Sequence, residues 1–132
     1  MLAKNAMTSE DEAVQKAGVA LNQMLLDVWG SKKTWKITAG KSYIHLWGWS
    51  GATTSAGRKG NAFTRIDADR VEDKFGVAGA VGLAHELGHA RGIMTDDPNT
   101  AVAGVGSENL ARTIKGCTAM RTGEHDKPAP CP

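Results

Sequence analysis

The strongest constraint on this chain is a His-Glu-x-x-His pattern made by His85, Glu86 and His89. In a helix, side chains four residues apart project from the same face, so both imidazoles can reach one metal ion. Glu86 lies one position further round the helix, where it can stay off the metal and take a proton from a water molecule activated there. The pattern therefore predicts a helix that holds Zn²⁺ between two histidines, with Glu86 as the general base.

The residues around this pattern predict a buried central helix from Val77 to Arg91. The segment is rich in Gly and Ala, which weakens an isolated helix but allows neighbouring backbones to approach closely. Two imidazoles and a carboxylate buried there without partners would be strongly unfavourable, and a metal removes that penalty by accepting both ring nitrogens. The alternative is a helix whose histidines form ordinary hydrogen bonds.

A catalytic zinc usually has three protein ligands, so a third ligand is expected downstream of His89. Glu108 is the first choice, because it follows at a short distance in a second helical pattern from Ser107 to Lys115. The same carboxylate also suits the first turn of that helix, paired with Arg112. The alternatives for the third ligand lie in turn or tail sequence and are Asp96, Asp97 and His125.

The N-terminal half of the chain predicts a scaffold of one helix and several strands. Apolar residues recur at three and four positions from Val14 to Val28, after a capping sequence at Ser9–Glu12 and before a stop at Gly30. Residues 33–38 and 42–49 predict a hairpin, residues 50–61 an exposed loop, and residues 62–68 a further strand. The hairpin tryptophans are expected in a buried sheet face, or else at the rim of a substrate cleft: Trp35, Trp47 and Trp49.

Length and charge indicate a single small domain. The chain has 132 residues and a formal net charge of +2, so neither disorder nor a nucleic-acid-binding surface is indicated. No stretch suits a membrane span, and the N-terminus lacks the apolar core of a secretory signal. We expect one monomeric domain over residues 1–132, with residues 1–8 and 126–132 flexible and with no nucleic-acid or membrane partner.

Two cysteines, Cys117 and Cys131, enclose a short C-terminal segment that contains Gly, Pro and charged residues. In an oxidising compartment they would suit a local disulfide, and two reduced thiols are the alternative. Neither cysteine has the paired spacing of a metal site.

The His85-Glu86-x-x-His89 pattern, followed by a glutamate on a later helix, resembles the gluzincin group of zinc metallopeptidases. Within that group, the stretch Gly82–Ala90 and the Glu108-Asn109-x-x-Arg112 block are similar to small bacterial effector and polymorphic-toxin peptidases of the non-LEE-encoded effector D type. The likeness spans roughly residues 77–125. The N-terminal half matches in pattern alone.

This resemblance implies an α+β, zincin-like fold with an N-terminal helix, a small antiparallel-rich sheet, the central motif helix and a short glutamate-bearing helix. It implies Zn²⁺ held by His85, His89 and Glu108, and a polypeptide as substrate. A toxin of this kind would have an immunity or inhibitor protein as a partner. It would leave the cell through a dedicated secretion system or as part of a larger toxin, and otherwise remain cytoplasmic.

One departure from the resembling family concerns the region of Arg121. The family has a tyrosine a few residues later, where this chain has Gly123-Glu124-His125. His125 is therefore a candidate catalytic residue that donates a hydrogen bond to the developing oxyanion. The alternative is a surface histidine in a charged tail.

Two other functions stay open at this point. The helix could hold a structural metal, or none, in a non-enzymatic binding or secretion-associated module. A zinc hydrolase could also act on a non-protein amide such as cell-wall material, because the motif identifies an activated water more securely than its target.

Overall fold

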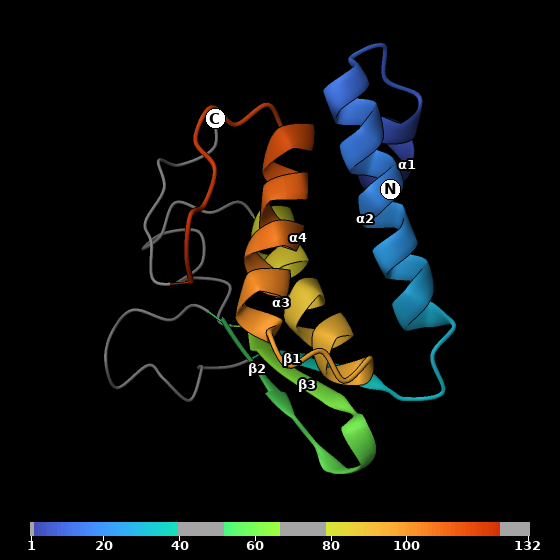
Figure 1. Ribbon diagram of the computed structural model, residues 1–132, viewed down its shortest axis with the longest axis vertical. Helices are drawn as coiled ribbons and strands as arrows, with labels where there is room; N and C mark the ends of the chain where they lie inside the picture. The colour runs from blue at the N-terminus through green and yellow to red at the C-terminus, as the bar shows by residue number, and fades with distance from the viewer. Residues whose placement is uncertain (1, 40–51, 67–78, 125–132) are drawn as a thin grey trace.

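Helices lie on one side of a small mixed sheet in the structure, a computed structural model that describes residues 2–39, 52–66 and 79–124 (Figure 1). The elements are, in chain order, α1 (Leu2–Met7), α2 (Glu12–Trp29), β1 (Trp35–Ala39), β2 (Ala52–Ala56), the 3-10 turn η2 (Arg58–Gly60), β3 (Ala62–Ile66), α3 (Gly79–Met94) and α4 (Thr100–Ile114). The fold therefore has the α+β class that the sequence predicts.

Helix α2 begins at Glu12 because Asp11 caps it. The Asp11 carboxylate accepts hydrogen bonds from the backbone N–H groups of Ala13 at 2.9 Å and Val14 at 3.3 Å. The sequence predicts Ser9 as the cap, but the Ser9 hydroxyl accepts from the Asp11 N–H at 3.2 Å. A carboxylate at this position also complements the positive end of the helix dipole, so Asp11 takes the role.

Residues 2–7 form α1 against α2 (Figure 1), whereas the sequence leaves residues 1–8 flexible. Ala3 and Ala6 are buried in this contact. A Cβ atom on Gly18 of α2 would lie 2.7 Å from the Ala6 Cβ and 2.8 Å from the Ala3 carbonyl oxygen. Small residues on both helices thus allow a close contact that hydrophobic periodicity does not reveal. Residues 126–132 lie outside the described residues.

The sheet has the strand order β1-β3-β2, with β1 parallel to β3 and β2 antiparallel to β3. Within the described ranges it is therefore mixed, not antiparallel-rich as the sequence predicts. The strands predicted at 33–38 and 62–68 correspond to β1 and β3. The hairpin strand predicted at 42–49, with Trp47 and Trp49, lies outside the described residues.

The exposed loop predicted at residues 50–61 is wrong, because this segment contains β2 and η2. Thr53 and Thr54 are β-branched and pair with β3, and such residues suit a strand. Lys59 and Gly60 then take positive φ values of 59° and 76°, which turn the chain back into β3. The high Gly, Ser and Thr content concealed a hairpin.

The predicted motif helix is present as α3, and α4 packs closely against it. A Cβ atom on Gly88 of α3 would lie 2.2 Å from the Ala103 carbonyl oxygen of α4. A Cβ atom on Gly104 of α4 would lie 2.7 Å from Nε2 of His89. Glycine at both positions therefore allows the two helices to approach closely beside His89.

Helix α4 begins at Thr100, whereas the sequence predicts the second helix only from Ser107. Gly104 and Gly106 lower the intrinsic helix propensity of the intervening residues. Close packing on α3 outweighs that preference, since glycine is what the contact requires. Glu108 consequently lies in the interior of a long helix and not in its first turn.

Small apolar side chains form the core between the helices. Its buried members lie on α1, α2, α3 and α4, with larger residues at the border: Ala3, Leu21, Val81, Ala84, Leu87 and Ala111, bordered by Met24, Val28 and Trp35. Among the helices that the structure describes, none has the length and apolar character needed to cross a membrane.

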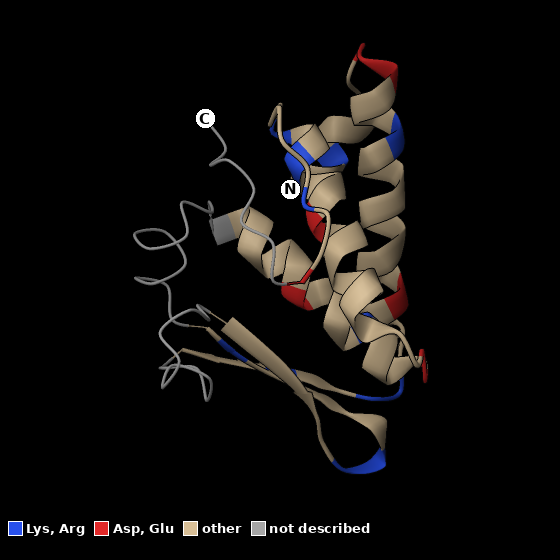
Figure 2. Ribbon diagram, turned by 60° about the vertical axis from the view of Figure 1, so that its left-hand side comes forward, with Lys and Arg blue, Asp and Glu red and all other residues tan. Residues whose placement is uncertain are grey.

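Charge is unevenly distributed over the fold (Figure 2). Residues 28–66, which include the three strands, contain Lys and Arg but no Asp or Glu. The described acidic residues lie on or between the helices and in the segment after α4. The described carboxylates that could bind a cation therefore come from the helices, their connections and the segment after α4, and not from the sheet.

Candidate metal centre

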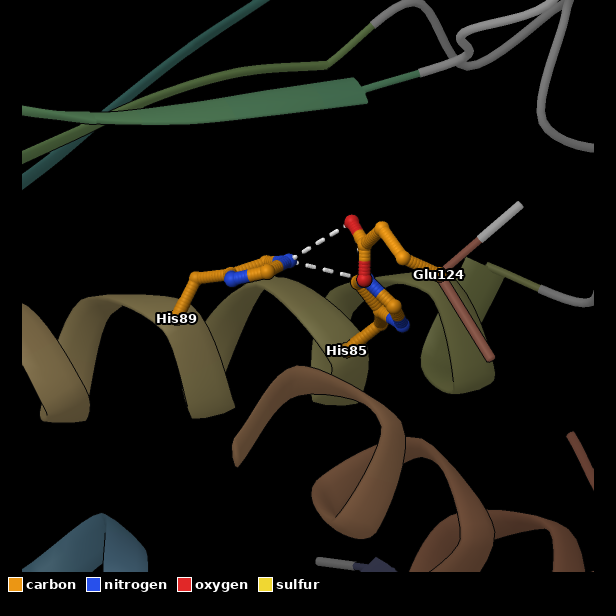
Figure 3. A group of neighbouring side chains, drawn as sticks. All are labelled: His85, His89 and Glu124. Carbon is orange, nitrogen blue, oxygen red and sulfur yellow. Dashed lines mark hydrogen bonds and ion pairs between the residues drawn. The ribbon is translucent and has the colours of Figure 1, made fainter. Parts of the chain in front are cut away.

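His85 and His89 project from the same side of α3 toward one another (Figure 3). Their Nε2 atoms are 3.0 Å apart and their ring centroids 4.7 Å apart. His85 is buried and His89 is half-buried. The structure thus brings the two predicted histidines together, with one nitrogen of each ring at a common point.

The third group at this point is Glu124, which the sequence did not identify. It lies in the segment after α4, and its carboxylate points at both rings (Figure 3). Its Oε1 is 3.1 Å from Nε2 of His89, and its Oε2 is 3.2 Å from Nε2 of His85. His85, His89 and Glu124 each offer one ligand atom within 4.8 Å of the others.

Glu108 approaches His85 from the opposite side of the ring. Its Oε1 lies 2.8 Å from Nδ1 of His85, and its Oε2 accepts a hydrogen bond from Nε of Arg112 at 2.6 Å. Arg121 also donates to Oε1 at 3.1 Å. Glu108 therefore contacts His85 at Nδ1 and does not join the groups that meet at the two Nε2 atoms. The sequence prediction that Glu108 is the third ligand is not met by this geometry.

This contact resembles a general feature of metal sites, in which a ligating histidine donates its other N–H to a carboxylate. A proton on Nδ1 of His85 satisfies Glu108 and leaves the Nε2 lone pair directed at the cluster. The carboxylate thereby selects the tautomer that can bind a metal.

The segment that carries Glu124 is held by the residues that follow Glu108 on α4. The Asn109 side chain makes two hydrogen bonds to the backbone of Arg121, accepting from its N–H at 2.7 Å and donating to its carbonyl at 2.8 Å. The Arg121 guanidinium in turn donates to the carbonyl of Gly123 at 2.9 Å and of Glu124 at 2.5 Å. The Glu108-Asn109-x-x-Arg112 block thus positions both the histidine and the segment that bears the third group.

The same segment begins at Cys117, which is disulfide-bonded. This state corresponds to the disulfide alternative considered for the sequence. Cys131 lies outside the described residues. The bond adds a covalent restraint at the start of the segment that leads to Glu124.

Electrostatics in the cluster favour bound positive charge. Burial lowers the pKa of His85, but its hydrogen bonds to Glu108 and Glu124 outweigh burial and raise that pKa to about 9. Burial raises the pKa of Glu124, but the two histidines outweigh burial and hold it well below its ordinary value. The site therefore retains a proton on His85 at neutral pH, in a place where a metal cation could replace it.

Glu86 is buried beside the cluster but turns away from it toward the sheet. Its Oε2 accepts a hydrogen bond from the hydroxyl of Thr54 on β2. Burial raises the pKa of Glu86, and the hydrogen bond from Thr54 and the nearby histidines oppose that rise. A carboxylate with a raised pKa, next to a cation site but not directed at it, has the properties of a general base.

The donor set fits a zinc ion. Donor atoms that share a tetrahedral zinc at about 2.0–2.1 Å lie roughly 3.3 Å apart. With Oε1 as the donor atom of Glu124, the three separations here are 3.0, 3.1 and 3.3 Å. Oε2 of Glu124 is buried and makes no hydrogen bond within the described residues, although it lies 3.2 Å from Nε2 of His85 as an ion pair. Two imidazoles with one carboxylate are also a ligand set that zinc uses in catalytic sites.

The remaining predicted ligands do not join the cluster. Asp96 is exposed, with φ of 58°, and its carboxylate lies 3.9 Å from Nζ of Lys33. Asp97 accepts a hydrogen bond from the backbone N–H of Asn99 at 2.9 Å, as the turn sequence predicts. His125, the candidate oxyanion donor, lies outside the described residues.

Comparison of the chain with protein-family models, with curated proteins and with solved structures gives no match. The resemblance to gluzincin peptidases therefore stays a prediction from the two motifs.

Proposed function

We propose that this protein is a zinc-dependent metallopeptidase in which His85, His89 and Glu124 hold the metal and Glu86 is the general base. The observation that carries the proposal is the meeting of three ligand atoms within 4.8 Å beside a buried carboxylate that stays outside the cluster. A structural zinc would leave that carboxylate without a role, since structural sites have four protein ligands.

The roles of the residues follow from their positions. When bound, zinc would supply a Lewis acid that polarises a scissile carbonyl and acidifies a water molecule. Glu86 would take a proton from the attacking water and deliver it to the leaving amine. Glu108 keeps His85 in the required tautomer, and Arg112 and Arg121 keep Glu108 ionised.

The position of β2 supports a polypeptide as the substrate. Among the described strands, in the order β1-β3-β2, this strand lies at an edge of the sheet, and Thr54 at its centre contacts Glu86. An extended peptide that pairs with an edge strand has its backbone held in a fixed register. Pairing with β2 would bring a peptide bond close to Glu86 and the cluster. Export as an effector or toxin, and an immunity protein as partner, rest on the motif resemblance alone.

The proposal is tested by zinc content and by cleavage of fluorescein-labelled casein. Protein purified without chelator should contain about one equivalent of zinc, since one cluster is present. Glu86→Gln should keep that zinc and lose roughly 100-fold or more in cleavage rate, the usual size of a general-base contribution. Glu10→Gln, a change at an exposed acid before α2, is the matched control and should cleave at the wild-type rate.

Three outcomes would contradict the proposal in different ways. Cleavage by Glu86→Gln at the wild-type rate would show that Glu86 is not the base. Bound zinc without cleavage of casein by the wild type would favour a structural metal module. Cleavage of purified peptidoglycan, but not casein, would show that the amide bond attacked is not in a protein.

A further inference from the structure

Three side chains of the sheet form a hydrogen-bonded chain that ends on Glu86. Each strand supplies one of them: Trp35 from β1, Thr64 from β3 and Thr54 from β2. Nε1 of Trp35 lies 2.7 Å from the Thr64 hydroxyl, which lies 2.7 Å from the Thr54 hydroxyl. The Thr54 hydroxyl then donates to Oε2 of Glu86. Thr64 is fully buried, so this chain runs through the interior.

The direction of the chain is fixed by the chemistry of its two ends. The indole N–H of Trp35 can only donate, so the Thr64 oxygen accepts from it. The Thr64 hydroxyl proton is then available for the Thr54 oxygen, and the Thr54 proton for Glu86. At the other end an ionised carboxylate can only accept. Both ends therefore require the same orientation of the two hydroxyl groups.

We propose that Thr54 is a positioning residue for Glu86, and that Thr64 and Trp35 fix the direction in which its hydroxyl donates. The inference rests on the proposed function of Glu86 as the base. By occupying Oε2, the Thr54 hydroxyl leaves Oε1 to face the water that attacks the substrate. It also holds the carboxylate away from the histidines, where it would otherwise compete as a fourth ligand.

The chain differs from ordinary packing in one respect that can be tested. Valine has nearly the volume of threonine but lacks the hydroxyl, so Thr54→Val changes the hydrogen bonding of this position much more than its packing. Loss of the hydroxyl leaves Oε2 of the buried Glu86 without that hydrogen bond. Thr54→Ser restores the donor but not the methyl group, so the pair of variants separates the two roles.

The first test reads the carboxylate directly and needs no substrate. The ¹³C resonance of the Glu86 carboxyl carbon is identified in labelled protein by its loss in Glu86→Gln, and is recorded with and without added Zn²⁺. We expect it to shift in Thr54→Val and to return close to its wild-type position in Thr54→Ser. Thr53→Val is the matched control, because side chains alternate along a strand and Thr53 faces the other side of the sheet.

Trp35→Phe gives a second, independent variant, which keeps the aromatic packing but removes the indole donor. We expect a smaller shift of the Glu86 carboxyl carbon than in Thr54→Val, since Thr64 is then free to rotate. An unshifted resonance in both Thr54→Val and Trp35→Phe would overturn the proposal, whatever the protein cleaves.

The second test is the kinetics of casein cleavage at full zinc occupancy. Thr54→Val should lower kcat roughly tenfold or more with KM nearly unchanged, and Thr54→Ser should recover most of the rate, because the change affects the base and not peptide binding. Wild-type kcat in Thr54→Val together with an inactive Glu86→Gln would overturn the positioning role and leave the peptidase proposal standing. If the wild type cleaves no casein, the peptidase proposal fails for this substrate, and the carboxyl resonance alone decides the role of Thr54.

Discussion

Two buried carboxylates near the histidines, Glu86 on α3 and Glu108 on α4, are held by different means. On the side of α4, Glu108 is bound by Arg112, Arg121 and His85, all of which carry or can carry positive charge. On the side of the sheet, Glu86 is bound by the neutral hydroxyl of Thr54. The first arrangement surrounds its carboxylate with cationic donors, and the second gives its carboxylate a neutral donor, as suits the proposed role of Glu86 as a base.

The pKa values of the two carboxylates diverge accordingly. Burial raises the pKa of Glu108, but its hydrogen bonds to His85 and Arg112 outweigh burial and lower it. Burial also raises the pKa of Glu86, and there the neutral Thr54 donor and the histidines do not reverse the rise. Environments that separate the pKa values of neighbouring acids are typical of catalytic sites. We therefore expect Glu108 to have a structural role and Glu86 to have the proposed role of general base.

The largest expected effect is on stability, from removing the acid on the charged side. Glu108→Ala leaves Arg112 buried without its carboxylate partner, and both side chains are only 1% exposed. We expect the free energy of unfolding of the zinc-free protein to fall by about 3–5 kcal/mol, measured by urea denaturation. Glu12→Ala, which breaks an exposed pair with Lys16, is the control and should cost about 0.5 kcal/mol or less. Equal losses in the two variants would mean that the buried network does not hold the fold.

A second prediction separates Glu124 from Glu108 as the third ligand. Glu124→Ala should weaken zinc binding roughly 100-fold or more, because it removes a ligand atom, whereas Glu108→Gln should weaken binding about tenfold, because it changes only the partner of His85. Competition with a chromophoric chelator measures both dissociation constants. The reverse order would return Glu108 to the ligand position that the sequence predicts.

The smallest effect is a pH dependence of the zinc-free protein. The pKa of His85 is raised from its ordinary value of 6.5 to about 9, so the folded state binds this proton more tightly than the unfolded state. The stability that it contributes is complete below pH 6.5 and is lost as the pH rises through about 9. We expect the melting temperature to fall by roughly 5–10 °C over this range.

The His85→Gln variant is the control, because it cannot titrate and should show a flatter profile over the same range. Zinc competes with the His85 proton, so zinc affinity should increase across this pH window. A wild-type melting temperature that stays constant between pH 6.5 and 9 would contradict the raised pKa of His85.

The features that could be predicted correctly from the sequence are those that depend on local residue patterns. The motif helix, its two facing histidines and the strands at β1 and β3 follow from spacing and from residue type. The start of α4 did not follow, because glycines that weaken an isolated helix are the residues that allow its contact with α3. The hairpin of β2 and β3 did not follow either, because residues 50–61 are rich in Gly, Ser and Thr, which are common in loops.

Glu124 could not be found by pattern, because it lies on a segment without helical or strand periodicity. Its position depends on the contact between Asn109 and the backbone of Arg121, which joins residues 12 apart in the chain. The one signal in the sequence is the departure of Gly123-Glu124-His125 from the tyrosine of the resembling family, and it favours His125 as readily as Glu124. Glu124 is three residues after Arg121, whose backbone is held by Asn109, and this contact brings the carboxylate to the histidines.

Gly104 gives the site a mutational signature. His85 is oriented by a carboxylate, but no hydrogen bond to Nδ1 of His89 is present among the described residues, and the His89 ring rests against the bare backbone of Gly104. In a library of variants selected for zinc binding, position 104 should accept glycine alone. Gly106, which has nothing within 4 Å of its Cβ position, should vary freely two residues away on the same helix.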